Sequence, residues 1–158
     1  MKPLNFTQRV VNVINTSIGG EHSESGLKRF EADVLTHKPD VLFIDYALND
    51  RGMGLERAKI AWEKMIRMSL EKNIKVILLS PSPDLRVDIK DDLSILDQHA
   101  NQIKELAKSF QIGLIDTYAL YKNKVKSGSN LVDYMSQVNH PNEKGHQMIT
   151  DVIMSYFK

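Results

Sequence analysis

The sequence of 158 residues contains no cysteine. This absence excludes a disulfide scaffold, a thiolate zinc site and a cysteine nucleophile, and it leaves the redox compartment open. No run of about eighteen apolar residues is present, so no membrane span is predicted. Residues 1–6 lack the apolar stretch of a secretory signal. These absences predict a soluble, cytoplasmic domain, although a secreted protein without its leader would have the same composition.

A strong charge of either sign is also lacking. The 21 Lys and Arg residues and the 20 Asp and Glu residues leave a net charge of +1. No broad positive field would attract nucleic acid or acidic lipid, so neither is expected as a partner. The 42% of hydrophobic residues is enough for a packed core. The length suits one domain, so we expect residues 1–158 to form a single domain.

What the chain does contain is an alternation of short apolar runs with longer amphipathic segments. The short runs are continuous, which is typical of strands buried on both faces. They cover residues 10–15, 40–46, 75–80 and 112–116. Apolar residues recur at helical spacing over residues 27–34, 55–70, 93–110 and 149–156. Strands alternating with helices predict an α/β fold, a flavodoxin-like three-layer αβα sandwich around a parallel sheet.

Ligands of such a sheet bind at the carboxyl ends of its strands. The first loop at that edge contains Gly19 and Gly20, which let the backbone turn sharply and present N–H groups to a ligand. The pattern is not the G-x-G-x-x-G of dinucleotide-binding proteins, so a nucleotide-binding domain is the weaker alternative. A tight turn with Ser23 as the helix cap would explain the same residues.

The second loop at this edge contains Asn49 and Asp50. An Asn side chain placed there can donate a hydrogen bond to an oxyanion as it develops. An Asx turn formed by the two residues is the structural alternative, because both side chains readily bond to nearby backbone groups. The segment by itself leaves the choice between these interpretations open.

The last loop contains His140, directly before Pro141. Proline suits the first turn of a helix, so His140 is predicted to lie near a helix N-terminus and to face the same edge. A metal site of His140, Glu143 and His146 is an alternative, but the spacing is not H-E-x-x-H and no thiolate supports it. We therefore expect no metal and no cofactor. His99 and His146 are expected on the solvent side of their helices.

Together these segments resemble the SGNH hydrolases, also called the GDSL esterase/lipase family, which is named for Ser, Gly, Asn and His in four sequence blocks. Residues 13–21 look like the second block, residues 38–50 like the third and residues 140–145 like the fifth. The order and spacing of the blocks agree with the family. The resemblance covers essentially the whole chain.

The resemblance implies a serine-type hydrolase of small acyl or acetyl esters, including esters on carbohydrate. The backbone N–H of Gly20 and the side chain of Asn49 would form an oxyanion hole. His140 would be the general base toward a serine and then the general acid toward the leaving group. The expected partner is a small-molecule ester, and no cofactor is needed.

The sequence departs from the family's pattern in three places. Ala47 replaces the usual Gly of the third block. Gln137 stands where the family has an acid three residues before His140, so Asp133 or a backbone carbonyl would have to orient the histidine. The first block, Gly-Asp-Ser, is absent, and with it the nucleophile and the first strand of the sheet.

The missing block has consequences for activity and for assembly. We expect a domain that is N-terminally incomplete and has little or no serine-esterase turnover. A catalytically inactive SGNH-like ligand-binding module is the alternative function. A sheet without its central strand must close up or be completed by a second copy, so a homo-oligomer is one expected state.

Overall fold

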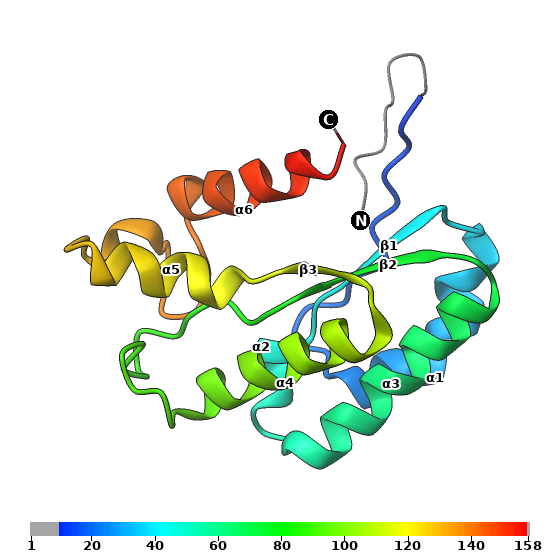
Figure 1. The fold of residues 1–158 in the computed structure, drawn as a ribbon, viewed down its shortest axis with the longest axis horizontal. Helices are drawn as coiled ribbons and strands as arrows, with labels where there is room; N and C mark the ends of the chain where they lie inside the picture. The colour runs from blue at the N-terminus through cyan, green and yellow to red at the C-terminus, as the bar shows by residue number, and fades with distance from the viewer. Residues whose placement is uncertain (1–9, 158) are drawn as a thin grey trace.

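A parallel sheet of three strands forms the centre of the computed structural model, which describes residues 10–157. The strands adjoin in chain order (Figure 1) and are β1 (Val41–Ile44), β2 (Lys75–Leu79) and β3 (Gly113–Ile115). Val41 pairs with Lys75 and Ile77 with Gly113. The strands predicted within residues 40–46, 75–80 and 112–116 are therefore confirmed, each in a shorter form.

Helices connect the strands, as a parallel sheet requires. The α-helices described are α1 (Ser23–Asp33), α2 (Ala47–Asp50), α3 (Leu55–Glu71), α4 (Ile95–Phe110), α5 (Thr117–Lys126) and α6 (Glu143–Ser155). Two short 3-10 helices, η1 (Leu35–His37) and η2 (Leu131–Tyr134), lie between them. Along residues 10–157, no helix combines the length and the apolar character that crossing a membrane would require.

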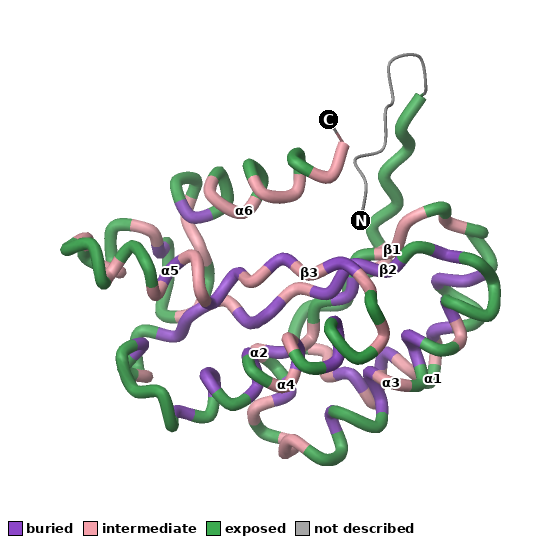
Figure 2. The backbone as a smooth tube through the Cα atoms, viewed as in Figure 1, coloured by how far each residue is buried: buried purple, intermediate pink, exposed green. Residues whose placement is uncertain are grey.

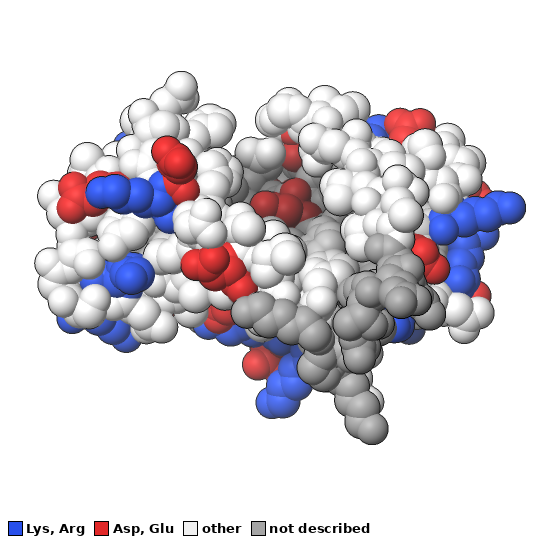
Figure 3. All heavy atoms as spheres, turned by 90° about the horizontal axis from the view of Figure 1, so that it is seen from above, with Lys and Arg blue, Asp and Glu red and all other residues white. Residues whose placement is uncertain are grey.

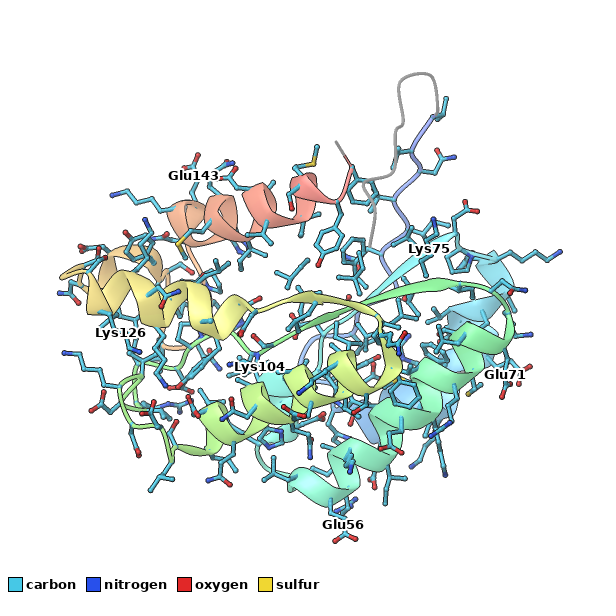
Figure 4. All side chains as sticks on the ribbon, in the orientation of Figure 1. Glu56, Glu71, Lys75, Lys104, Lys126 and Glu143 are labelled. Atoms are coloured by element: carbon cyan, nitrogen blue, oxygen red, sulfur yellow. The ribbon has the colours of Figure 1, made fainter. Side chains whose placement is uncertain are left out.

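The helices form a layer on each side of the sheet. Helices α1, α3 and α4 lie below it in Figure 1, where α3 and α4 contact β2 and α1 packs on α3. Helix α6 lies above it and contacts β3. This is the predicted flavodoxin-like three-layer arrangement. The outer surfaces carry charge, and the labelled side chains of Glu56, Glu71 and Glu143 point away from the body of the protein (Figure 4).

The apolar stripes of the helices build the core. Ala58, Trp62, Met65 and Ile66 of α3 are all buried against the lower face of the sheet (Figure 2). A second buried cluster surrounds α5 and contains Tyr118 and Tyr121. That helix was not predicted, although Asp116 is a clear N-cap signal: its carboxylate accepts a hydrogen bond from the N–H of Ala119 at 3.1 Å.

Helix starts differ from the sequence prediction in three places. Helix α1 is capped by the His22 side chain, not by Ser23, which is buried inside the first turn. Helix α4 begins after Leu93, because the Ser94 hydroxyl accepts from the N–H of Asp97. Helix α6 begins at Glu143 with Asn142 as its N-cap, so Pro141 precedes the helix instead of opening it.

The strand predicted for residues 10–15 is wrong. This segment is extended but belongs to no sheet, and Figure 2 shows it exposed. Val10 and Val13 are 87% and 89% exposed. Within the described part of the chain, no backbone hydrogen bond joins the segment to β1. Valine and isoleucine favour strands, but a strand is stable only when another strand satisfies its backbone groups.

Candidate active site

The first two loops meet at the carboxyl end of β1. The Asn49 side-chain N–H donates to the backbone carbonyl of Glu21 at 2.9 Å. Gly20 directly precedes Glu21 and has a φ of +74°, a left-handed conformation that favours glycine. The structure thus brings Gly20 and Asn49 into one exposed site. An amide carries two N–H groups, so Asn49 keeps one for a ligand.

Asp50 stabilises the contact between the first two loops from the interior of the protein. It is fully buried, and its carboxylate accepts from the N–H of Ser23 at 2.8 Å and from the indole N–H of Trp62 at 2.7 Å. The Asx-turn interpretation of Asn49 and Asp50 is therefore wrong. Both residues belong to helix α2, and their side chains bond to distant segments instead of their own turn.

A buried carboxylate connects the second loop to the third loop, residues 80–92, which follows β2. The Asp84 side chain has no exposed surface and is paired with Arg51 and Arg86, the latter at 2.6 Å. Hydrogen bonds from Arg86 and Arg51 hold the pKa of Asp84 well below its ordinary value, against the opposing effect of burial. No local pattern signals the pairing of Asp84 with Arg51, because the two residues are far apart in the chain.

The third loop in turn contacts the loop that carries His140. The N–H of Leu85 donates to the carbonyl of Val138 at 2.8 Å. His140 is exposed, and its backbone carbonyl accepts from the N–H of Ser136 at 2.9 Å. The first, second and last loops are therefore linked in a row through residues 80–92 by direct contacts, and the row ends at the loop of His140.

The imidazole of His140 has no orienting partner among residues 10–157. Neither Gln137 nor the carboxylate of Asp133 forms a hydrogen bond with the ring, and no backbone carbonyl does. The described serines do not pair with it either. Ser80 is buried and donates to Asp116 at 2.8 Å. The Ser136 hydroxyl donates to the backbone carbonyl of His140 at 3.1 Å, and among residues 10–157 no serine is hydrogen-bonded to the imidazole.

The upper face of the protein has an acidic hollow (Figure 3). Seen from above the sheet, the surface is hollowed, and acidic side chains lie at the bottom of the hollow (Figure 3). Asp45 directly follows β1, and solvent reaches it. Loss of hydration of the carboxyl group inside the surrounding protein raises the pKa of Asp45 to about 7, and the nearby Asp50 carboxylate adds to this effect. Sequence reasoning missed Asp45, although its position at the end of a strand was a usable signal.

His99 was expected to face solvent, and this prediction is wrong. The residue is 1% exposed, and its Nε2 atom has no hydrogen-bond partner within the described chain. Burial lowers the pKa of His99, while the Asp50 carboxylate acts in the opposite direction. Helix α4 contacts both the sheet and α2, so its buried arc is wider than the stripe of Leu96, Ala100 and Ile103 suggested.

The metal alternative has no support from the geometry. Between residues 10 and 157, no group of three or more His, Asp and Glu side chains is arranged to hold a metal ion. His140, Glu143 and His146 are each exposed, and they do not form a common site.

Comparison with known proteins decides the family. The sequence model of the GDSL-like lipase/acylhydrolase family matches residues 4–148. The chain belongs to this family. No curated protein matches this GDSL-like chain by sequence. The family is one of ester-hydrolysing enzymes, so the fold and the residues discussed above belong to a hydrolase scaffold.

Solved structures of similar fold include acetylxylan esterases. A catalytic mutant of the enzyme from Geobacillus stearothermophilus superimposes with a TM-score of 0.80 at 20% identity, covering 92% of this GDSL-like chain and 72% of its own. A second acetyl xylan esterase gives a TM-score of 0.73 at 23% identity, with 87% of this chain and 77% of its own covered. At these identities the likeness establishes the fold.

Proposed function

We propose that this chain forms the substrate site of a serine-type hydrolase of small acyl esters, with acetyl esters on carbohydrate as the substrate class. Gly20 and Asn49 are the oxyanion hole, and His140 is the general base. The observation that carries the proposal is the hydrogen bond from Asn49 to Glu21, which holds the amide beside the backbone of Gly20. Membership of the GDSL-like family and the acetylxylan esterases of similar fold support it.

The chemistry follows from these positions. A serine oxygen attacks the ester carbonyl while His140 takes its proton, and the carbonyl oxygen becomes an oxyanion. The N–H of Gly20 and the second N–H of Asn49 donate to that oxyanion, and His140 returns the proton to the leaving alcohol. Removal of one such donor typically raises the barrier by about 3 kcal/mol, so activity would depend strongly on Asn49.

The nucleophile must come from outside the described residues. In the esterase from Geobacillus stearothermophilus, the catalytic mutants replace a serine near the N-terminus, a histidine, and an aspartate three residues before that histidine. Here Gln137 stands three residues before His140. Its side chain carries no charge to stabilise an imidazolium, so two parts of the triad are weakened or missing.

The unpaired outer edge of β1 supports the same inference. If β1 is an interior strand in the sheet of this family, a further strand should lie along its outer edge. The structure shows no such strand among residues 10–157. We therefore expect this chain alone to bind an ester without turning it over efficiently. Gln137 and the absence, among residues 10–157, of a serine hydrogen-bonded to the His140 imidazole also favour a second candidate function, an inactive module that binds acylated ligands.

One experiment separates these functions. The purified chain is tested for hydrolysis of p-nitrophenyl acetate, and its binding to acetylated xylo-oligosaccharide is measured by calorimetry. We expect binding that Asn49→Ala weakens, with little or no hydrolysis. His146→Ala is the matched control, because that histidine is exposed on α6 and should leave binding unchanged.

Each result has a clear meaning. Hydrolysis that disappears in His140→Ala would show that the chain has its own nucleophile and would refute the expectation of low turnover. Slow hydrolysis that Gln137→Asp increases would favour the hydrolase, whereas binding with no detectable hydrolysis in either the unmodified chain or Gln137→Asp would favour the binding module. Absence of binding to either acetylated ligand would overturn the proposal of an acyl-ester site.

A further inference from the structure

Two arginines from different loops share one buried carboxylate. Arg51 comes from the second loop and Arg86 from the third, and both donate to the side chain of Asp84, which has no exposed surface. The Nε and Nη2 atoms of Arg86 lie 2.9 Å and 2.6 Å from the two oxygens of this carboxylate. We call Arg51 and Arg86 the arginine pair.

The charges around Asp84 do not balance. Two guanidinium groups and one carboxylate leave one net positive charge, and among residues 10–157 no second carboxylate forms an ion pair with either arginine. By contrast, Arg57 on α3 is matched by a carboxylate of its own, that of Glu24. Two cations held against one carboxylate repel each other, so a further anion placed between them would stabilise the arrangement.

Most N–H groups of the arginine pair are available to a ligand. A guanidinium group carries five N–H donors. Within the described chain, Arg51 uses one of them and Arg86 uses two, all toward Asp84. The side chains of Arg51 and Arg86 are 29% and 63% exposed, so a dissolved ligand can reach both. Because Asp84 holds them in place before a ligand arrives, less conformational entropy is lost on binding.

The arginine pair borders the candidate active site. Arg51 follows Asn49 by two residues, so their Cα atoms lie within about 7 Å of each other. The residue before Arg86 donates its N–H to the carbonyl of Val138, in the loop of His140. The pair therefore joins the loop of the proposed oxyanion-hole amide to the loop of the proposed general base.

We infer that the arginine pair is a binding subsite for a carboxylate group of a small-molecule ligand. A guanidinium group binds both oxygens of a carboxylate through two parallel N–H donors, and the opposite charges strengthen each hydrogen bond. The one net positive charge around Asp84 matches the one negative charge of a carboxylate. Next to an acyl-ester site, this subsite selects acetylated carbohydrate that also carries an acidic sugar. That selection rests on the proposed function, whereas carboxylate binding itself does not.

A matched pair of sugars tests the subsite without any ester. Glucuronate carries a carboxylate, and glucuronamide is the same sugar with a neutral amide in its place. Calorimetry should show that the chain binds glucuronate at least about tenfold more tightly than glucuronamide. Arg86→Gln should remove most of this difference. Arg51→Lys should reduce it as well, because lysine keeps the charge beside Asp84 but lacks the paired donors.

Arg67→Gln is the matched control. Arg67 is exposed, and its guanidinium group lies 4.9 Å from the ring centre of Phe110, at the end of α4 opposite to the third loop. This variant loses the same charge and should keep the full preference for glucuronate. In nuclear magnetic resonance spectra, glucuronate should shift the Nε–H signals of the arginine pair and leave that of Arg67 unchanged. Circular dichroism checks that each variant remains folded.

A second pair of ligands connects the subsite to the ester site. Acetylated xylo-oligosaccharide with a glucuronate branch should bind at least about tenfold more tightly than the unbranched form, and Arg86→Gln should weaken only the branched ligand. Equal binding of glucuronate and glucuronamide, or equal losses in Arg86→Gln and Arg67→Gln, would overturn the subsite even if the unbranched ligand binds. Selective binding of glucuronate without binding of the unbranched ligand would support the subsite and overturn only the proposed ester site.

Discussion

The hydrogen bonds of Asp50 lead to the sharpest prediction from this structure. Replacement by Asp50→Ala leaves the N–H of Ser23 and the indole N–H of Trp62 buried without an acceptor. An unsatisfied buried donor costs about 1–3 kcal/mol, so two cost about 2–6 kcal/mol. Removing a buried carboxylate offsets part of that loss. We expect the free energy of unfolding to fall by about 3 kcal/mol. This is a large share of the total free energy of unfolding of a typical domain, which is about 5–15 kcal/mol.

Urea denaturation measures this loss with two independent probes. Circular dichroism follows the helices. The fluorescence of Trp62, the single tryptophan, follows the surroundings of the indole ring that bonds to Asp50. Coincident transitions would establish two-state unfolding and a valid free energy. Asp33→Ala is the matched control, because its carboxylate is 51% exposed and forms only a surface ion pair, so it should cost less than about 1 kcal/mol.

A double-mutant cycle isolates the hydrogen bond between Asp50 and Trp62. Trp62→Phe keeps an aromatic ring and removes the donor, and stability is then followed by circular dichroism alone. The coupling energy should be about 1.5–3 kcal/mol, since the acceptor is a carboxylate. A loss below about 1 kcal/mol in Asp50→Ala, or no coupling to Trp62, would refute the reasoning that this carboxylate holds the first two loops together.

Three further predictions concern single residues. The pKa of Asp45 is about 7 in the folded protein, whereas the same carboxyl group has a pKa near 3.8 in the unfolded chain, so its ionisation destabilises the fold as pH rises between these values. The variant Asp45→Asn should therefore have a higher melting temperature than the unmodified protein at pH 8 but not at pH 4. An equal difference in melting temperature at both pH values would contradict this reasoning. Gly26→Ala would overlap the Tyr46 hydroxyl and should lower the free energy of unfolding in urea by about 1–3 kcal/mol; an unchanged value would show that Tyr46 moves freely. The variant Asp84→Asn should lower the free energy of unfolding by about 3 kcal/mol at pH 6. Because the pKa of Asp84 is depressed in the folded protein, this loss of stability should become smaller only below pH 3.8. A loss of stability that persists at lower pH would rule out the missing charge as its cause.

Local patterns predicted most of the fold. The runs around Val76 and Ile115 are continuously apolar because these strands are covered on both faces, and that signal does not depend on distant residues. The stripe of Trp62 and Met65 likewise marks the buried side of α3. The meeting of Gly20 and Asn49 was also predictable, because the carboxyl ends of parallel strands share one edge.

Other features depended on contacts that no local pattern reveals. His99 is buried because α4 is covered by α2 as well as by the sheet, which widens its buried arc. Asp84 needs Arg51 and Arg86, one from another loop, to be stable without solvent. That no group within residues 10–157 orients the His140 imidazole likewise depends on how η2 and the loop after it fold.

The sequence by itself determined the elements, their order and the edge at which chemistry would take place. It also determined that residues 10–14 are suited to a strand. Only the tertiary structure decided that they form none here, because backbone propensity is a property of one segment and pairing requires a second. The tertiary structure also decided which polar groups are buried together, since burial depends on every element that covers a residue and not on its neighbours in the chain.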